Sequence, residues 1–127
     1  MRKCLILMTM ALFLTACENR DSYQYLTTHP KELEQLLSQC RDMPIAQSLR
    51  DMNCITAENA RQEVASLLNE AQTSIQGFGQ KIMATQIELA DLKSQYQKNP
   101  SSSLATAIHD QEDYIARLLA ICSYIGE

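Results

Sequence analysis

The sequence predicts an all-α protein, with a short N-terminal helix packed on a long antiparallel coiled-coil-like helical hairpin. The chain of 127 residues contains only three glycines and three prolines, so the turn-rich alternating segments typical of sheets have little support. Apolar residues also recur at alternating spacings of four and three over most of the second half. That alternation is typical of helices that pack along a seam.

The N-terminus has the composition of a secretory signal. Arg2 and Lys3 precede an apolar run from Cys4 to Leu14, which is too short to span a bilayer. The following Leu14-Thr15-Ala16-Cys17 box resembles the processing site of bacterial lipoproteins. The resemblance implies that residues 1–16 are a lipoprotein signal peptide and that Cys17 becomes the acylated N-terminus. The alternatives are an ordinary cleaved signal peptide, in which Cys17 occurs by chance, and an uncleaved N-terminal anchor.

The mature chain is expected to be acidic. Loss of residues 1–16 removes Arg2 and Lys3, leaving 9 basic groups against 15 acidic ones and a formal charge of −6. An acidic chain without clustered Lys or Arg has no electrostatic basis for holding phosphates, so nucleic acid is not an expected partner. The implied location is the bacterial cell envelope, lipid-anchored and facing the periplasm, with inner and outer membrane both open.

Residues 17–28 are expected to form an acylated tether. From Glu18 to Thr28 the chain is polar and shows no helical stripe, and its bulky apolar groups are Tyr23, Tyr25 and Leu26. Such a segment reaches at most roughly 35–40 Å when extended. Its aromatic side chains have two alternative fates, docking on the folded domain or lying near lipid head groups.

A single helical domain is expected over residues 29–127, beginning with a Cys-bracketed helix and loop over 29–56. The first helix should run from about 30 to 42, because proline is favoured at the first helical position and Pro44 disfavours helix at Met43. One helix face carries the apolar stripe, consisting of Leu33, Leu36, Leu37 and Cys40. A short helical turn is expected between Ile45 and Asp51, with Leu49 and Met52 as candidates for the core.

Cys40 and Cys54 bracket this connector. Disulfides persist in secreted proteins, so we expect these two cysteines to be bridged, which would contribute about 3 kcal/mol in the chain-entropy model. The spacing alone leaves the other pairings open, because Cys40, Cys54 and Cys122 allow three single bridges.

A long helix is expected over residues 57–97, with Thr56 as its N-cap. Its seam has seven-residue spacing in two interleaved sets: Val64, Ala71, Phe78, Thr85 and Leu92, and Leu68, Ile75, Ile82, Leu89 and Tyr96. Gly77 and Gly79 lie within this pattern and weaken a helix by up to about 1 kcal/mol each. They would either kink the helix or allow close approach of a neighbouring backbone.

A returning helix is expected over residues 103–125, after a turn around Pro100. Its seam is Leu104, Ile108, Gln111, Ile115, Leu118, Cys122 and Ile125. Antiparallel folding about position 100 places Gln111 near Leu89 and makes Cys122 a buried seam residue. The shorter returning arm leaves the stripe from Val64 to Ala71 uncovered, so either the 30–42 helix or a second copy of the chain, in a homodimer, should cover it.

No catalytic or metal-binding constellation is present in the sequence. His29 and His109 are far apart, and acid pairs such as Asp110 with Asp113 are ordinary on a solvated helix surface. Zinc sites need clustered His and Cys ligands, and no phosphate loop or nucleophile motif occurs. We therefore expect no enzyme activity, no metal and no cofactor.

The first half of the chain resembles the entry-exclusion lipoproteins of the EexN type, carried with conjugative type IV secretion loci. The matching pieces follow the Leu14–Cys17 box in order: Tyr25-Leu26-Thr27-Thr28-His29-Pro30, Glu32, Cys40-Arg41, Asn53-Cys54-Ile55-Thr56-Ala57 and Asn59-Ala60. The Asn-Pro-Gly-like turn of the family is altered here to Met43-Pro44-Ile45, and residues 61–127 extend beyond the family's usual length.

The resemblance implies a membrane-anchored periplasmic lipoprotein that blocks redundant conjugative DNA transfer by protein contact. Its partners would be the membrane, through the lipid on Cys17, and an envelope or conjugation-machine protein. The candidate partner-binding residues are Tyr25, His29, Pro30, Glu32 and Arg41. A structural lipoprotein that stabilises a type IV secretion or other envelope assembly is the alternative.

Overall fold

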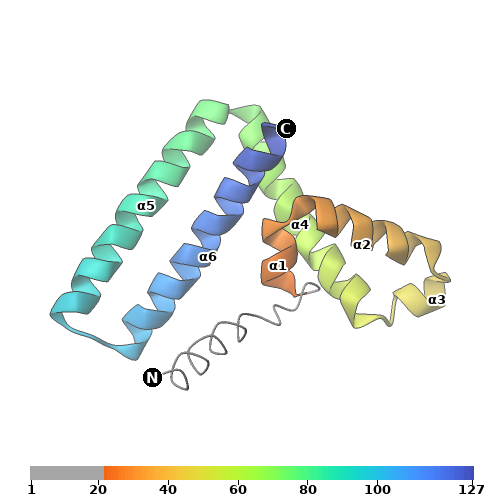
Figure 1. The fold of residues 1–127 in the computed structure, drawn as a ribbon, viewed down its shortest axis with the longest axis horizontal. Coiled ribbons are helices and arrows are strands. Elements are labelled where there is room, and N and C mark those ends of the chain that lie inside the picture. Colours follow the sequence, from red (N-terminus) through yellow and green to blue (C-terminus); the bar gives the residue numbers. More distant parts are fainter. Residues whose placement is uncertain (1–21) are drawn as a thin grey trace, which may run out of the picture.

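The computed structural model describes residues 22–127, and all regular secondary structure in this range is α-helical (Figure 1). The predicted all-α class is therefore confirmed. The signal peptide, Cys17 and the first part of the predicted tether lie outside the described residues. The described helices are α1 (Tyr23–Thr28), α2 (Pro30–Asp42), α3 (Ile45–Ser48), α4 (Met52–Thr73), α5 (Ile75–Lys98) and α6 (Ser102–Ile125).

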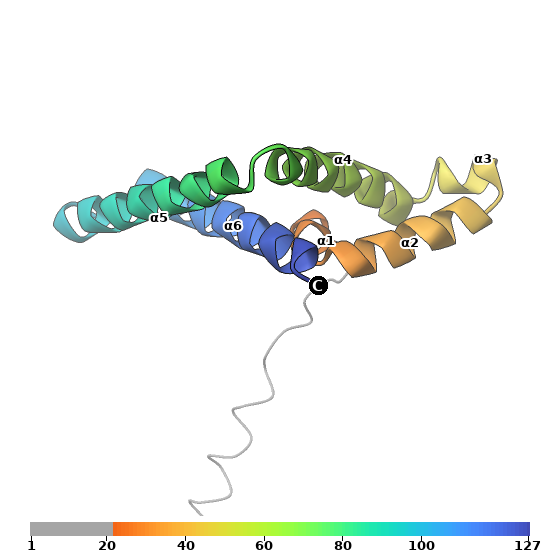
Figure 2. The same ribbon diagram turned by 90° about the horizontal axis from the view of Figure 1, so that it is seen from above.

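The helices form two antiparallel pairs that meet at α4. On one side α5 and α6 lie side by side, and on the other α2 runs along α4, with α3 at the far end of that pair (Figure 1). The helix α1 fills the angle between the pairs and packs on both α4 and α6. Seen from above, the whole arrangement is elongated and shallow (Figure 2).

The hydrophobic core lies where the two pairs meet. Its largest fully buried side chains include Phe78 of α5, Leu26 of α1 and Leu118 of α6. Two fully buried alanines of α4, Ala57 and Ala60, belong to the same cluster. Because the separation of packed helices depends on the side chains at their contact, these small residues leave room for neighbouring helices to approach α4.

Part of the predicted tether is a folded helix. Residues 23–28 form α1, capped by Ser22, whose Oγ accepts a hydrogen bond from the Tyr25 backbone N–H at 3.2 Å. Leu26 and Thr27 are fully buried, and Tyr23 and Tyr25 pack against the core. The aromatic side chains of this segment therefore dock on the domain. A six-residue helix has too few turns to show a stripe and is stabilised by tertiary packing, which is why the sequence pattern missed it.

The first predicted helix is confirmed from Pro30 to Asp42. Leu33 is buried, Leu36 and Leu37 pack on the core, and Met43 has the extended backbone that a following proline favours. The α4 stripe that the short hairpin arm leaves uncovered is indeed buried, since α1 and α2 both pack against α4. The exposed stripe that suggested a homodimer is thus covered within the chain.

The predicted long helix over residues 57–97 is wrong in two respects. It begins earlier, at Met52, because Asp51 rather than Thr56 caps α4: the Asp51 carboxylate accepts from the backbone N–H groups of Asn53 and Cys54. It is also interrupted at Ser74, whose backbone is extended with φ −154° and ψ 96°.

Ser74 ends one helix and begins the next. Its backbone N–H donates to the Glu70 carbonyl, while its Oγ accepts from the Gly77 N–H at 3.0 Å. A Cβ at position 77 would lie 2.9 Å from that Oγ, so the glycine leaves room for the cap. The break precedes both glycines, and neither of them is the kink. One consequence is that Ile75, a predicted seam residue, is exposed.

We predict that Ser74→Ala lowers the free energy of unfolding by about 1 kcal/mol, the usual cost of removing a serine N-cap. Chemical denaturation of the two proteins measures this difference. Ser66→Ala is the matched control, because Ser66 is an exposed residue within α4 and surface substitutions usually stay within about 0.5 kcal/mol. Equal stability of the two variants would contradict a capping role for Ser74.

The returning helix α6 is confirmed, with Ser101 as its N-cap. The predicted register holds to within about one turn, because Gln111 Nε2 lies 3.3 Å from the Thr85 carbonyl and 2.9 Å from the Glu88 carboxylate. The predicted burial of Cys122 is wrong: it is exposed, and Ile121 is buried instead. Near its C-terminus α6 also packs on α1 and α4, so its buried face rotates away from the α5 seam.

Candidate functional site

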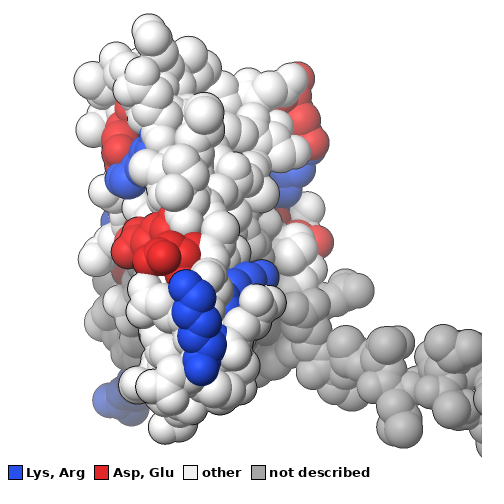
Figure 3. All heavy atoms as spheres, turned by 90° about the vertical axis from the view of Figure 1, so that its left-hand side faces the viewer, with Lys and Arg blue, Asp and Glu red and all other residues white. Residues whose placement is uncertain are grey.

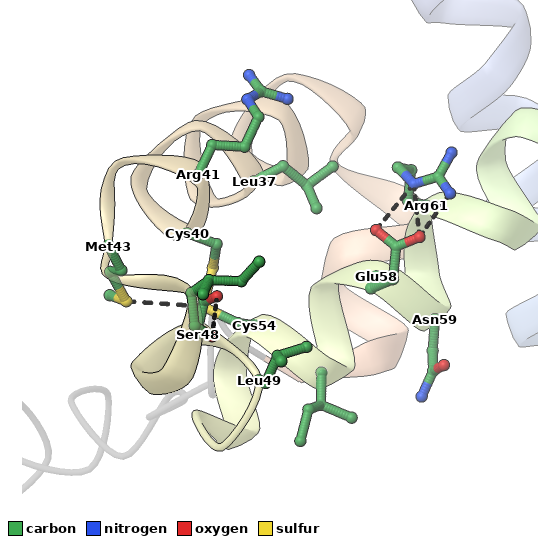
Figure 4. A pocket seen from close by; sticks show the side chains of 12 residues that line it. Leu37, Cys40, Arg41, Met43, Ser48, Leu49, Cys54, Glu58, Asn59 and Arg61 are labelled. Atoms are coloured by element: carbon green, nitrogen blue, oxygen red, sulfur yellow. Dashed lines mark hydrogen bonds and ion pairs between the residues drawn. A yellow bond between two sulfur atoms is a disulfide. The ribbon is translucent and has the colours of Figure 1, made fainter.

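A groove lies between α2, α3 and the first half of α4, at the end of the molecule away from the α5–α6 pair (Figures 1 and 4). Its volume is about 820 Å³. We call it the disulfide groove and define it by its lining residues: Leu37, Cys40, Arg41, Met43, Ile45, Ser48, Leu49, Cys54, Ile55, Glu58, Asn59 and Arg61.

The Cys40–Cys54 disulfide closes one end of the groove. It joins the last turn of α2 to the first turn of α4, with the two Cα atoms 5.7 Å apart. The pairing expected from the sequence is therefore present. Met43 adds to this end, because its Sδ lies 3.9 Å from Cys54 Sγ (Figure 4). The bridge fixes the separation of the two helices whose side chains form the groove walls.

Large apolar side chains around the groove are exposed. Ile45 and Leu49 on and after α3 are 78% and 71% exposed, and Met52 at the start of α4 is 69% exposed. The expectation that Leu49 and Met52 extend the core is wrong, because the single turn of α3 lies beyond the region where α1, α4 and α6 meet (Figure 1). Clustered exposed apolar residues are typical of interaction sites, whereas scattered ones are ordinary.

The groove carries few charged side chains, and their balance is positive. Arg61 donates two hydrogen bonds from Nε to the Glu58 carboxylate, at 2.9 and 3.0 Å. These hydrogen bonds hold the pKa of the Glu58 carboxyl below its ordinary value. Arg41 stands on the α2 rim and forms no ion pair within residues 22–127 (Figure 4). The lining residues thus retain one uncompensated positive charge.

The other sequence-predicted contact residues lie elsewhere. Tyr25, His29, Pro30 and Glu32 gather at the corner between α1 and α2, whereas Arg41 lies at the opposite end of α2, roughly 15–20 Å away at 1.5 Å per helical residue. The Tyr25 and His29 rings stack with centroids 3.8 Å apart. His29 Nδ1 lies 2.8 Å from the Tyr25 carbonyl oxygen, and Pro30 is buried. These residues therefore pack the α1–α2 corner, and their predicted contact with a partner stays a prediction.

Glu32 is the exception at this corner. Its Oε2 is buried and has no hydrogen-bond partner among the described residues. It borders a smaller hollow of about 290 Å³ between the start of α2 and the end of α6. Two contacts link the same ends, a hydrogen bond from the Tyr124 hydroxyl to Glu34 and an ion pair between Lys31 and Glu127.

Sequence reasoning missed most of the groove lining. The sequence pattern assigns Leu49 to the core and Ile45 only to a short helical turn, and Glu58 with Arg61 resembles an ordinary exposed pair three residues apart. One signal was available: the Cys-bracketed connector contains several large aliphatic residues, more than a solvated loop of that length needs.

Side chains that could hold a metal ion are dispersed over the described residues. Between residues 22 and 127, no group of three His, Cys, Asp or Glu side chains is placed to hold a metal ion. His109 is exposed, with Nε2 3.7 Å from an Asp113 carboxylate oxygen. On the face seen from the α5 side, acidic and basic side chains are interspersed among uncharged ones (Figure 3).

None of the helices described has both the length and the apolar character needed to cross a membrane.

No family model, curated protein or solved structure matches the chain. The fold and the groove define an all-α domain with a disulfide-closed, mainly apolar groove. Because one fold class serves many functions, the function has to be argued from the site.

Proposed function

We propose that this chain is a membrane-anchored periplasmic lipoprotein that blocks redundant conjugative DNA transfer by protein–protein contact. The observation that carries the proposal is the position of the disulfide groove. Its walls and floor come from residues 37–61, which largely coincide with the part of the chain from Cys40 to Ala60 that resembles the entry-exclusion lipoproteins. The resemblance and this mainly apolar groove thus fall on the same segment.

The groove suits protein contact. Its lining is mainly apolar with a few polar groups at fixed positions, an arrangement that binds ligands or peptide segments by burial and selects them by hydrogen bonds and charge. Contact alone is sufficient for exclusion, because a recipient needs only to obstruct the incoming machine. No catalytic group is required in this proposal.

The anchor is proposed to be the lipid on Cys17. Stable membrane attachment requires more than one acyl chain, at about 0.8 kcal/mol per buried methylene. Because α1 begins at Tyr23, only the short stretch between Cys17 and Tyr23 can separate the lipid from the folded domain. Its reach is at most roughly 20 Å. The domain would therefore work close to the membrane surface rather than on a long tether.

A mating comparison tests the proposal. Recipient cells that express this chain alone should take up the related conjugative element at a frequency reduced by about tenfold or more, whereas donors that lack it should transfer normally. Normal uptake by the expressing recipient would contradict exclusion. The control recipient expresses the Cys17→Ser variant, which is expected to lose the lipid anchor and most of the exclusion.

The alternative function, a structural lipoprotein of a secretion or other envelope assembly, is favoured by one observation. The α5–α6 pair extends well away from α2 and α3 (Figure 1) and belongs to the part of the chain that exceeds the family's usual length. A structural role predicts the opposite outcome of the mating comparison, with transfer failing when the donor lacks the protein.

A further inference from the structure

The disulfide groove has the shape of a site for a helix. Two roughly antiparallel helices, α2 and α4, form its walls, and α3 with the Cys40–Cys54 bridge closes one end. Leu37 projects from the α2 wall toward the α4 wall, where Glu58 and Arg61 lie (Figure 4). Amphipathic helices bind in such grooves through apolar side chains spaced by three or four residues.

The charges specify the occupant further. Described residues 22–127 contain 8 basic and 13 acidic side chains, so this part of the protein is acidic as a whole. The groove is locally the opposite: Arg61 neutralises Glu58, and Arg41 remains without an ion pair in this range. A carboxylate beside the apolar side chains of the occupant would therefore complement the rim, and complementary charge selects partners and fixes their register.

We propose, on the basis of the proposed function, that the disulfide groove binds an amphipathic helix of a partner protein that presents two bulky apolar side chains about one turn apart and an acidic residue beside them. The apolar side chains lie against Leu37, Leu49 and Ile55. The acidic residue pairs with Arg41 on the α2 rim.

Two other occupants fit the groove less well. In a twofold dimer the same patch meets itself, which would bring the two Arg41 side chains together and leave the acidic bodies to repel each other. A flat bilayer surface would meet the exposed Ile45 and Leu49 but would not fill the groove between the α2 and α4 walls. One uncompensated arginine adds only about 1 kcal/mol of attraction to anionic lipid.

Site-specific photo-crosslinking in the full-length protein tests the inference. A benzophenone amino acid replaces Leu49 of the protein in recipient cells, and crosslinking is carried out during mating. The same substitution at Ile45 is a second probe, in case the change at position 49 itself weakens binding. Met83, 63% exposed on the α5–α6 pair, is the control position. We expect positions 45 and 49, but not position 83, to form a crosslink to another protein. The crosslinked segment of that protein should have apolar residues at helical spacing and an adjacent Asp or Glu.

Charge variants complete the test. Arg41→Glu should reduce the crosslink yield by about tenfold, whereas Arg41→Lys should retain most of it. The inference is overturned by crosslinks to lipid, to a second copy or to a segment without an acidic residue. It is equally overturned by an unchanged yield in Arg41→Glu, or by a yield at positions 45 and 49 no higher than at 83.

Exclusion and crosslinking are measured in the same recipient cells, so this inference and the proposed function on which it rests can fail independently. If the wild-type recipient excludes the incoming element and the crosslinks fail as above, the groove is not the contact surface, but exclusion stands. If the crosslinks map to an acidic amphipathic helix and the wild-type recipient does not exclude, the partner chemistry stands and the proposed function is wrong.

Discussion

Replacement of Phe78 by alanine is expected to lower the free energy of unfolding by about 3–5 kcal/mol. Phe78 is 1% exposed and lies in the first turn of α5, in a cluster with Leu118 and Ile121 of α6 and Ala71 of α4. Its ring thus fills the space where the two helix pairs meet. Truncation removes the apolar contacts and leaves a cavity that the surrounding helices can close only in part.

Urea denaturation monitored by helical circular dichroism measures this loss. Since domains of this size have total stabilities of only about 5–15 kcal/mol, Phe78→Ala can leave too little folded protein for the measurement. Phe78→Leu then provides a milder second variant, expected to cost roughly 1–1.5 kcal/mol. The control is Tyr96→Ala, since Tyr96 is an exposed aromatic residue near the end of the same helix. An equal loss at positions 78 and 96 would contradict the position of the core.

Loss of the disulfide is the second large expected effect. Cys40→Ser and Cys54→Ser should each lower the free energy of unfolding by about 3 kcal/mol, the chain-entropy value for a short loop, here closed by residues 14 apart in sequence. Each should also impair exclusion to a similar degree, because either change frees the α2 and α4 ends that hold the groove open. The double variant should lose little more than either single one.

Cys122→Ser is the matched control for these variants. Cys122 is a free and exposed thiol, so its replacement should change stability by less than about 0.5 kcal/mol and leave exclusion intact. A buried Cys122 would carry a larger packing penalty, but this residue is exposed. A Cys122 variant as unstable as the Cys40 variant, or a Cys54 variant as stable as the parent protein, would contradict this account of the bridge.

Much of the fold follows from local features of the sequence. Pro30 and Pro44 delimit α2 because proline suits a first helical position and disfavours helix immediately before it. The turn at Asn99 to Ser101 is equally marked, and the apolar spacing after it predicts an antiparallel return with nearly the observed register.

The remaining features depend on contacts that periodicity does not encode. The apolar seven-residue spacing continues through Ser74, yet the helix is interrupted there. The Ser74 Oγ accepts a capping hydrogen bond from the Gly77 N–H, and the two helix pairs diverge at this point. The helix α1 exists because Leu26 and Thr27 fill the angle between α4 and α6. Cys122 is exposed because α6 packs on α1 and α4 as well as on α5, so that its buried face does not follow the α5 seam to the C-terminus.

Part of the candidate site could be predicted from the sequence. The disulfide is expected from the predicted extracytoplasmic compartment, although the spacing leaves other pairings open, and Arg41 is a candidate through the resemblance. The apolar residues around the groove are distinguished by their exposure to solvent, which depends on where the core ends. Tyr25, His29 and Pro30 are candidates through the resemblance to the entry-exclusion lipoproteins. They pack the α1–α2 corner, and their role in partner binding stays a prediction.

The most direct test of the account compares two exposed apolar residues in the recipient. Leu49 borders the disulfide groove and is 71% exposed, whereas Met83 lies on α5, away from it, and is 63% exposed. Replacement of either by serine should leave stability within about 0.5 kcal/mol of the parent protein. The measurement is the frequency of conjugative transfer into recipients that express each variant at equal levels. The account predicts that Leu49→Ser restores uptake by about tenfold while Met83→Ser excludes like the parent protein; equal exclusion by both variants would contradict it.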